Sequence, residues 1–184
     1  VFYRGLPNPV EISVPGVPSD KVDVRISGNH KIKKESDGTF TITPGRDSKA
    51  NVTVSAELPD GSKKTLPAKE FRVKRIPDPA PFFVGKTSSD RTISKQALIG
   101  ADGLGAQMVN FDFDVRVVVK SFSVSVSRDG TLVEKSSNSN RLSAEMKQLF
   151  NRVSRGNVVY FEDIIVGMPD GTERQVAAMK LKVN

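Results

Sequence analysis

PDGSKKTLPAKEFRV, at residues 59–73, returns as PDGTERQVAAMKLKV at residues 169–183. Each copy begins with Pro-Asp-Gly, in which proline presets φ for a tight turn and glycine accepts the positive φ that the turn requires. Each copy then reaches a short run in which apolar and charged residues alternate, Phe71-Arg72-Val73 and Leu181-Lys182-Val183. This alternation is typical of a half-buried β-strand. The repeat therefore predicts two β-domains in tandem, each ending on the same hairpin.

A proline-rich stretch, Ile76-Pro77-Asp78-Pro79-Ala80-Pro81, follows the first copy almost at once. Proline restricts the backbone of a connector and makes it semi-rigid. We therefore expect an interdomain joint formed by Pro77, Pro79 and Pro81. The expected domains are residues 1–78 and residues 79–184, and each is long enough to bury a small core.

Short alternating runs separated by turn residues fill the first domain. In residues 22–26, for example, three apolar residues alternate with Asp23 and Arg25, and Ser36-Asp37-Gly38 precedes the next alternating run. About seven short strands of this kind predict an immunoglobulin-like β-sandwich. The expected fold class is therefore mainly all-β, with two tandem immunoglobulin-like sandwiches.

The second domain is longer and contains two helical signals. Ser94 is an N-cap candidate for a short helix over residues 95–99, which Gly100 would end. A second helix is expected over residues 143–155, with Ser143 as its N-cap. Its apolar face is formed by Leu142, Met146, Leu149, Phe150 and Val153. We expect both helices to be insertions in a β-rich domain.

A long strand is expected over residues 111–126, with a bend midway. Asp112 and Asp114 would share one face of that strand, whereas the neighbours Glu162 and Asp163 would point to opposite sides of another strand. Two facing carboxylates are the groups that glycoside hydrolysis uses. Acids on open strand faces are more typical of a solvated surface or a partner contact, so we favour that interpretation.

The remaining candidates for chemistry are weak. The chain has no cysteine, which excludes thiolate nucleophiles and cysteine-based metal sites. Its one histidine, His30, lies in a turn, where we expect an exposed side chain without a catalytic partner. The glycine-rich segment 100–105 follows a helix and enters a strand, the reverse of a phosphate-binding loop, so we expect a flexible connector or contact loop. We expect no enzyme activity, no metal and no cofactor.

The net charge of +7 raises the question of nucleic-acid binding. The basic excess is spread over both expected domains, and the one local cluster is Lys31, Lys33 and Lys34, with Phe40 as its only nearby aromatic residue. A nucleic-acid surface usually combines a concentrated basic stripe with aromatic residues for stacking. We therefore expect no nucleic-acid partner.

Four stretches of sequence point to one family. They are YRGLPNP at 3–9, VPGV at 14–17, EFRVKRIPDP at 70–79 and NFDFD at 110–114, the last leading into VSV at 124–126. In this order they resemble the C-terminal region of the GldM family, also called PorM, over essentially the whole chain. The resemblance implies the last two domains of the periplasmic shaft of the gliding-motility and type IX secretion motor of Bacteroidetes.

The resemblance also implies partners and a location. It implies a homodimer in the periplasm, anchored in the inner membrane by a segment absent from this chain. Through that segment the protein would meet GldL, which uses the proton-motive force, and its tip would engage the outer-membrane-associated ring of GldK and GldN. The implied role is transmission of torque or conformational change, without catalysis.

Within that role we expect the second domain to dock, because its helix and glycine-rich loop depart from a plain sandwich. The expected contact residues are Asp102, Leu104 and Gln107 on the loop and Lys147, Arg152 and Arg155 on the helix. The alternative is a carbohydrate-binding or adhesin-like tandem β-sandwich protein. Sugar sites usually need exposed aromatic platforms, and the chain has no Trp and two Tyr, which makes the alternative weaker.

Overall fold

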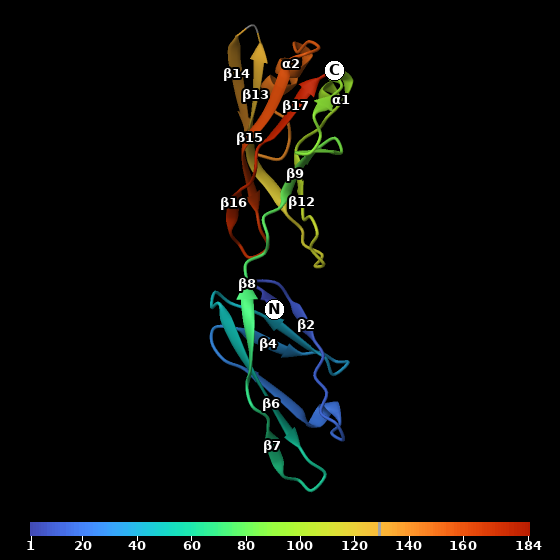
Figure 1. Cartoon of the computed structure of the whole chain (residues 1–184), viewed down its shortest axis with the longest axis vertical. Coiled ribbons are helices and arrows are strands. Elements are labelled where there is room, and N and C mark those ends of the chain that lie inside the picture. The colour runs from blue at the N-terminus through green and yellow to red at the C-terminus, as the bar shows by residue number, and fades with distance from the viewer. Residues whose placement is uncertain (129) are drawn as a thin grey trace. The chain divides into compact units, whose positions relative to one another are not determined.

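The computed structural model describes residues 1–128 and 130–184. It divides into two compact units, Val1–Ile76 and Pro77–Asn184, so the boundary lies slightly earlier than residue 78. Both units consist mainly of β-strands, and the second also contains two short helices (Figure 1). The fold class is therefore the predicted one, tandem immunoglobulin-like β-sandwich domains.

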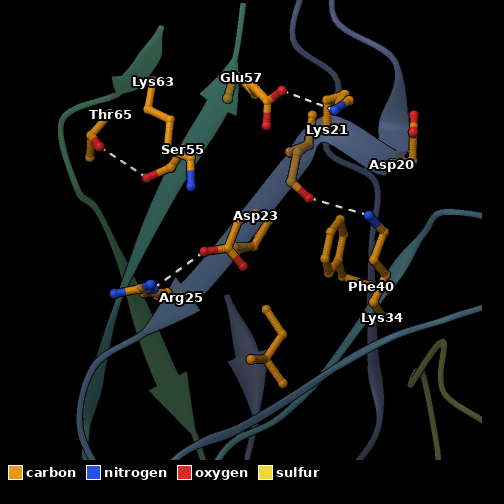
Figure 2. A pocket seen from close by; sticks show the side chains of 14 residues that line it. Asp20, Lys21, Asp23, Arg25, Lys34, Phe40, Ser55, Glu57, Lys63 and Thr65 are labelled. Carbon is orange, nitrogen blue, oxygen red and sulfur yellow. Dashed lines mark hydrogen bonds and ion pairs between the residues drawn. The ribbon is translucent and has the colours of Figure 1, made fainter. Parts of the chain in front are cut away.

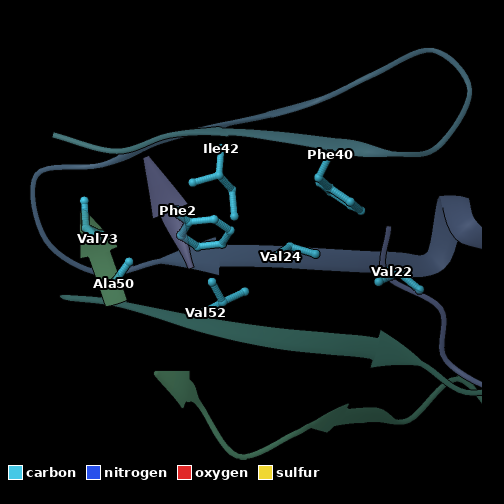
Figure 3. Packing of buried hydrophobic residues seen from close by; sticks show 8 residues of the cluster. All are labelled: Phe2, Val22, Val24, Phe40, Ile42, Ala50, Val52 and Val73. Atoms are coloured by element: carbon cyan, nitrogen blue, oxygen red, sulfur yellow. The ribbon is translucent and has the colours of Figure 1, made fainter. Parts of the chain in front are cut away.

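The first unit is a sandwich of two sheets. One sheet has the strand order β1-β8-β6-β3, with β7 paired to β6, and the other has the order β2-β5-β4. Figure 3 shows Phe2, Val24 and Val52 of the first sheet facing Phe40 and Ile42 of the second across the core. The elements are β1 Phe2–Tyr3, β2 Asn8–Val10, η1 Ser19–Lys21, β3 Val22–Ile26, β4 Lys31–Lys34, β5 Phe40–Thr43, β6 Lys49–Glu57, β7 Lys63–Thr65 and β8 Lys69–Lys74.

The second unit has a larger sheet of order β11-β17-β15-β13-β14, with β16 paired to β15, and a small sheet of order β10-β9-β12. Phe83, Phe150 and Phe161 form the centre of its core, with the Phe83 and Phe161 ring centroids 4.5 Å apart. The elements are β9 Ala80–Phe83, β10 Lys86–Thr87, β11 Thr92–Ile93, α1 Lys95–Ile99, β12 Gly105–Gln107, β13 Val118–Arg128, β14 Thr131–Ser137, α2 Ala144–Asn151, β15 Val158–Gly167, β16 Glu173–Gln175 and β17 Met179–Val183.

The doubled hairpin folds in the same way in both units. β6 pairs with β8 and then with β7, and β15 pairs with β17 and then with β16. Gly61 and Gly171 have φ values of 82° and 77°, as the predicted turns require. In each turn an aspartate side chain, Asp60 or Asp170, accepts the backbone N–H two residues on, at 2.9 and 3.1 Å. The turn chemistry that the sequence predicts is thus present twice.

Both helices start at the predicted caps. The Ser94 hydroxyl accepts the Ala97 N–H at 3.2 Å, and the Ser143 hydroxyl accepts the Met146 N–H at 3.3 Å. The first helix ends at Gly100 as predicted, but the second ends at Asn151, earlier than expected. Beyond that end the chain still buries Val153, so the apolar pattern continued past the helix itself.

The long strand predicted from residue 111 was wrong in its first half. β13 begins at Val118, which pairs with Gly167, the last residue of β15. Because the neighbouring strand ends there, residues 111–117 have no strand alongside to continue the ladder. Asp112 and Asp114 therefore lie on an irregular segment. The predicted bend is confirmed by register shifts between Val119 and Ser123.

Candidate interaction surface and interdomain joint

The proline-rich stretch is only partly a connector. Pro77 is exposed, whereas Pro79 and Pro81 are buried. Pro81 lies inside β9, where it pairs with Ala106 of β12. Pro81 is therefore part of a sheet of the second unit, and this corrects the expectation that it forms part of the joint. The short segment Pro77–Pro79 precedes the first strand of that unit.

An arginine that the sequence analysis missed holds this segment. The side chain of Arg174, on β16, is only 5% exposed. Its Nη1 atom donates to Asp78 Oδ1 at 2.9 Å and to the Pro77 carbonyl at 3.4 Å, and its Nη2 atom donates to Asp170 Oδ2 at 3.2 Å. We call Arg174, Asp78 and Asp170 the latch. It bonds the connector to the second Pro-Asp-Gly turn.

The electrostatics of the latch favour the ion pair. The Asp170 side chain is 5% exposed. Burial acts to raise its pKa, but hydrogen bonds from the Thr172 hydroxyl and N–H, together with the Arg174 charge, outweigh burial and leave the pKa below its usual value. A charge buried without a partner is strongly destabilising. Arg174 and Asp170 therefore depend on each other, and Asp78 adds a further charge-assisted bond to the arginine.

The internal repeat contains a signal for the latch. Lys64 of the first copy occupies the position of Arg174 in the second, and Lys64 is exposed on β7. Arginine presents a planar fork of donors that suits carboxylates better than a lysine ammonium does. The change from Lys64 to Arg174 between the two copies therefore points to position 174. The repeat does not reveal the partner of Arg174, because Asp78 lies 96 residues away in the chain.

The glycine-rich loop is held in place by backbone hydrogen bonds. The Leu104 N–H donates to the Asn140 carbonyl at 2.8 Å, and the Leu142 N–H donates to the Asp102 carbonyl at 2.9 Å. Leu104 is 1% exposed, so it is a core residue, which corrects the expectation of a surface contact there. A Cβ atom on Gly103 would collide with the Asn140 carbonyl. The glycine thus permits a close backbone approach, and the expected flexible connector is an anchored one.

The other expected contact residues are exposed, but they do not form one cluster. Asp102 is bonded through its carbonyl to the segment just before α2, whose exposed residues include Lys147. Arg152 caps the end of α2 and Arg155 lies in the turn that follows. Gln107 instead pairs with Ala80 at the start of β9. The structure thus places Asp102 near the helix and Gln107 near the connector.

His30 is buried, in contrast to the expected surface position. Its side chain is 0% exposed. Nδ1 accepts the Gly45 N–H at 3.1 Å, so the proton of the neutral ring sits on Nε2, which donates to the Lys49 carbonyl at 2.9 Å. His30 therefore connects the loop at Gly45 to the start of β6, and both ring nitrogens are occupied.

An open hollow of about 690 Å³ lies on the first unit, beside β3 and β6. Figure 2 shows two of its cations in ion pairs: Lys21 with Glu57 at 2.9 Å and Arg25 with Asp23 at 3.3 Å. Lys34 donates to the Ser19 carbonyl at 2.6 Å, and its ammonium lies 5.6 Å from the centre of a neighbouring aromatic ring. Small-molecule sites are usually apolar clefts with a few convergent polar groups. This polar hollow, in which Lys21 and Arg25 are paired with carboxylates, does not have that character.

The structure describes residues 1–128 and 130–184, and two features are absent from them. Within them, no group of three or more His, Cys, Asp or Glu side chains could hold a metal ion. In the same part of the chain, no helix has both the length and the apolar character needed to cross a membrane.

The fold and its surfaces define the class: a pair of immunoglobulin-like β-sandwich domains, the second with helical insertions. Residues 1–74 match the family model of the GldM third domain, and residues 77–184 match that of the GldM C-terminal domain. The chain therefore belongs to the GldM family, which is part of gliding motility and type IX secretion. The resemblance noted in the sequence is confirmed.

One solved structure that resembles the chain is that of the fibronectin(III)-like modules of CbhA from Clostridium thermocellum. It is 15% identical, and the match covers 100% of this chain and 88% of that chain with a TM-score of 0.29. No curated protein matches the chain. The family assignment rests on the two domain models.

Proposed function

We propose that the chain is a non-catalytic structural and interaction module of the periplasmic shaft of a type IX secretion and gliding motor. It transmits torque or conformational change from an inner-membrane complex containing GldL to the outer-membrane-associated ring of GldK and GldN. The shaft is a homodimer, and the full-length protein is anchored in the inner membrane. Family membership supports the assignment to type IX secretion and gliding. The latch is the observation that supports transmission of torque or conformational change through the connector.

The physical argument concerns stiffness. A connector transmits force only if its ends are fixed to the bodies that it joins. Arg174 bonds the Pro77 carbonyl and the Asp78 carboxylate to β16, and Pro79 is buried. The freedom of the connector is therefore reduced on the side of the second unit by proline geometry and by an ion pair.

The carbohydrate-binding alternative gains no support. Tyr3 and Tyr160 are both half-buried, and the Lys180 ammonium lies 5.7 Å from the Tyr160 ring centroid. A sugar platform needs an open aromatic face. A glycan array with the purified chain tests this alternative directly, and strong specific binding would favour it.

The test of the proposed function replaces residues 77–79 by Gly-Ser-Gly in the full-length protein. β9 starts at Ala80, so every strand of both units is kept, whereas the bond from Arg174 to the Asp78 carboxylate is removed. The expected result is normal protein abundance with loss of type IX secretion and gliding. A second variant, Ser62→Gly in the exposed first turn, is the control and leaves secretion unchanged. Normal secretion by the Gly-Ser-Gly variant contradicts transmission through the connector.

A further inference from the structure

Both helices and the end of the last strand lie together at one end of the second unit (Figure 1). α1 packs against α2. The turn after α2 reaches β17 through a Gly156 N–H to Val183 carbonyl bond of 2.8 Å, and the Lys182 N–H donates to the Arg91 carbonyl at 2.8 Å. We call this region the helical end.

The helical end is rich in cations. Its basic residues are Arg91, Lys95, Lys147, Arg152, Arg155 and Lys182. All are exposed except Lys95, which is half-buried. Within residues 1–128 and 130–184, none of these side chains lies in an ion pair. Their positive charge is thus available to a partner.

Few carboxylates oppose this charge locally. Glu145 lies in the first turn of α2, where its own backbone N–H and then the Ser143 hydroxyl lower its pKa. Asp102 is exposed beside the loop. Asp90 is occupied by Lys86 at 3.3 Å. Glu134 is a further exposed acid on β14, which contacts α2, and the six basic residues still outnumber these four acids.

Three acids of the second unit, Asp112, Asp114 and Asp170, lie toward its other end. β13 starts opposite Gly167 and runs antiparallel to β15, so that its later residue Ser127 pairs with Val158 near the helical end. Asp112 and Asp114 precede the start of β13, and the second Pro-Asp-Gly turn follows the end of β15. These acids therefore lie away from the helical end.

An exposed apolar side chain ends α1, one helical turn after Lys95. Ile99, the last residue of α1, is 42% exposed, whereas its neighbour Leu98 is 0% exposed and anchors the helix in the core. Protein interfaces commonly combine a desolvated apolar anchor with a charged rim that steers the partner. Ile99 and the basic residues of the helical end have this composition.

We propose that the helical end binds an acidic protein surface with an apolar recess that accepts Ile99. The inference rests on the proposed function and specifies the chemistry of the partner's surface. A membrane would need more apolar area, and no Phe is exposed within the described residues. A nucleic acid would need aromatic side chains for stacking. An acidic protein surface needs neither.

The test uses the 184-residue chain with purified GldK and GldN as probes, measured by surface plasmon resonance. The double variant Lys147→Glu/Arg152→Glu reverses two exposed charges, and Ile99→Asp removes the anchor. Lys63→Glu/Lys64→Glu, on exposed β7 of the first unit, is the control with the same charge change. Circular dichroism confirms that each variant is folded.

The expected result is a Kd raised at least about tenfold by the double variant and by Ile99→Asp, with the control within about twofold of wild type. The association rate should fall about tenfold between about 0.05 M and about 0.5 M NaCl. Equal binding by wild type and both helical-end variants overturns the inference while the proposed function stands.

The remaining outcomes are also decisive. If the wild type binds neither ring protein, the proposed docking fails. The helical end is then tested by itself: its affinity for an acidic peptide of alternating Glu and Leu is compared with its affinity for a basic peptide of alternating Lys and Leu. Equal affinity for both peptides overturns the inference.

Lipid vesicles and self-association give two further outcomes. If the wild type binds vesicles of phosphatidylcholine and phosphatidylglycerol and the variants do not, the surface is assigned to lipid. Self-association that the variants abolish assigns it to a second copy. Either result overturns the acidic-partner inference.

Discussion

The Nη1 atom of Arg174 lies 2.9 Å from Oδ1 of Asp78, a residue 96 positions earlier in the chain. The same guanidinium reaches Asp170, whose side chain is 5% exposed. One buried cation thus links the connector, β16 and the second Pro-Asp-Gly turn. The latch makes the entrance to the second unit part of its folded structure.

Replacing Arg174 by Ala should destabilise the second unit by about 3 kcal/mol, because it leaves the buried Asp170 carboxylate without its cation. Arg174→Lys should lose less, since it keeps the charge but not the forked geometry. Differential scanning calorimetry of the two units measures both changes. Lys64→Ala, at the equivalent exposed position, is the control and should change stability by no more than about 0.5 kcal/mol. Equal losses for Arg174→Ala and Lys64→Ala would contradict the latch.

The stability of the second unit should decrease in acid. Burial acts to raise the pKa of Asp170, but its bonds to Thr172 and the Arg174 charge leave it below the ordinary value of 3.8. A carboxyl group with a lowered folded-state pKa contributes stability that is present above the unfolded value and is lost as the pH falls through the folded value. Urea unfolding between about pH 5 and about pH 2 measures this slope. Asp170→Asn should flatten it, and an unchanged slope would refute the assignment.

Replacing His30 by Ala should destabilise the first unit by about 2 kcal/mol. The change leaves the Gly45 N–H and the Lys49 carbonyl without their partner. Hydrogen exchange should show faster exchange at Gly45, with the second unit unaffected. Lys31→Ala, at an exposed neighbouring position, is the matched control. If both variants unfold at the same urea concentration as wild type, the hydrogen bonds of His30 contribute nothing.

Leu104 and Gln107 should differ in how much each contributes to the stability of the second unit. Leu104→Ala should cost about 3 kcal/mol because it opens a cavity in the core. Gln107→Ala, at an exposed position, should leave stability within about 0.5 kcal/mol of wild type. Thermal unfolding compares the two. A Leu104→Ala protein as stable as the Gln107→Ala protein would show that Leu104 is not a core residue in solution.

Much of the fold was predictable because its signals are local. A Pro-Asp-Gly turn depends on the φ values of adjacent residues, and Ser94 and Ser143 cap helices through backbone groups three residues away. Apolar alternation likewise reports which face of a strand is buried. These features need no knowledge of distant partners, so the tandem sandwiches and both helix starts could be inferred from the chain alone.

The errors arose where distant segments meet. The extended pattern at residues 111–117 forms no strand because β15 ends at Gly167, opposite Val118. Leu104 and His30 are buried by neighbours that the local sequence does not reveal. Whether a pattern is paired, or a polar group is withdrawn from water, depends on what the rest of the chain places beside it.

The latch shows most clearly which features follow from the local sequence and which depend on the tertiary structure. Residue order alone established a repeated hairpin and a proline-rich connector, because turn and proline geometry are properties of neighbouring dihedral angles. It did not establish that Arg174 bonds Asp78, since that pair exists only once folding has brought β16 against the connector and excluded water around the guanidinium. Local backbone geometry determines the strands and turns. Long-range packing and desolvation determine which charged side chains are buried in ion pairs and which remain exposed, because both depend on residues that are distant in the sequence.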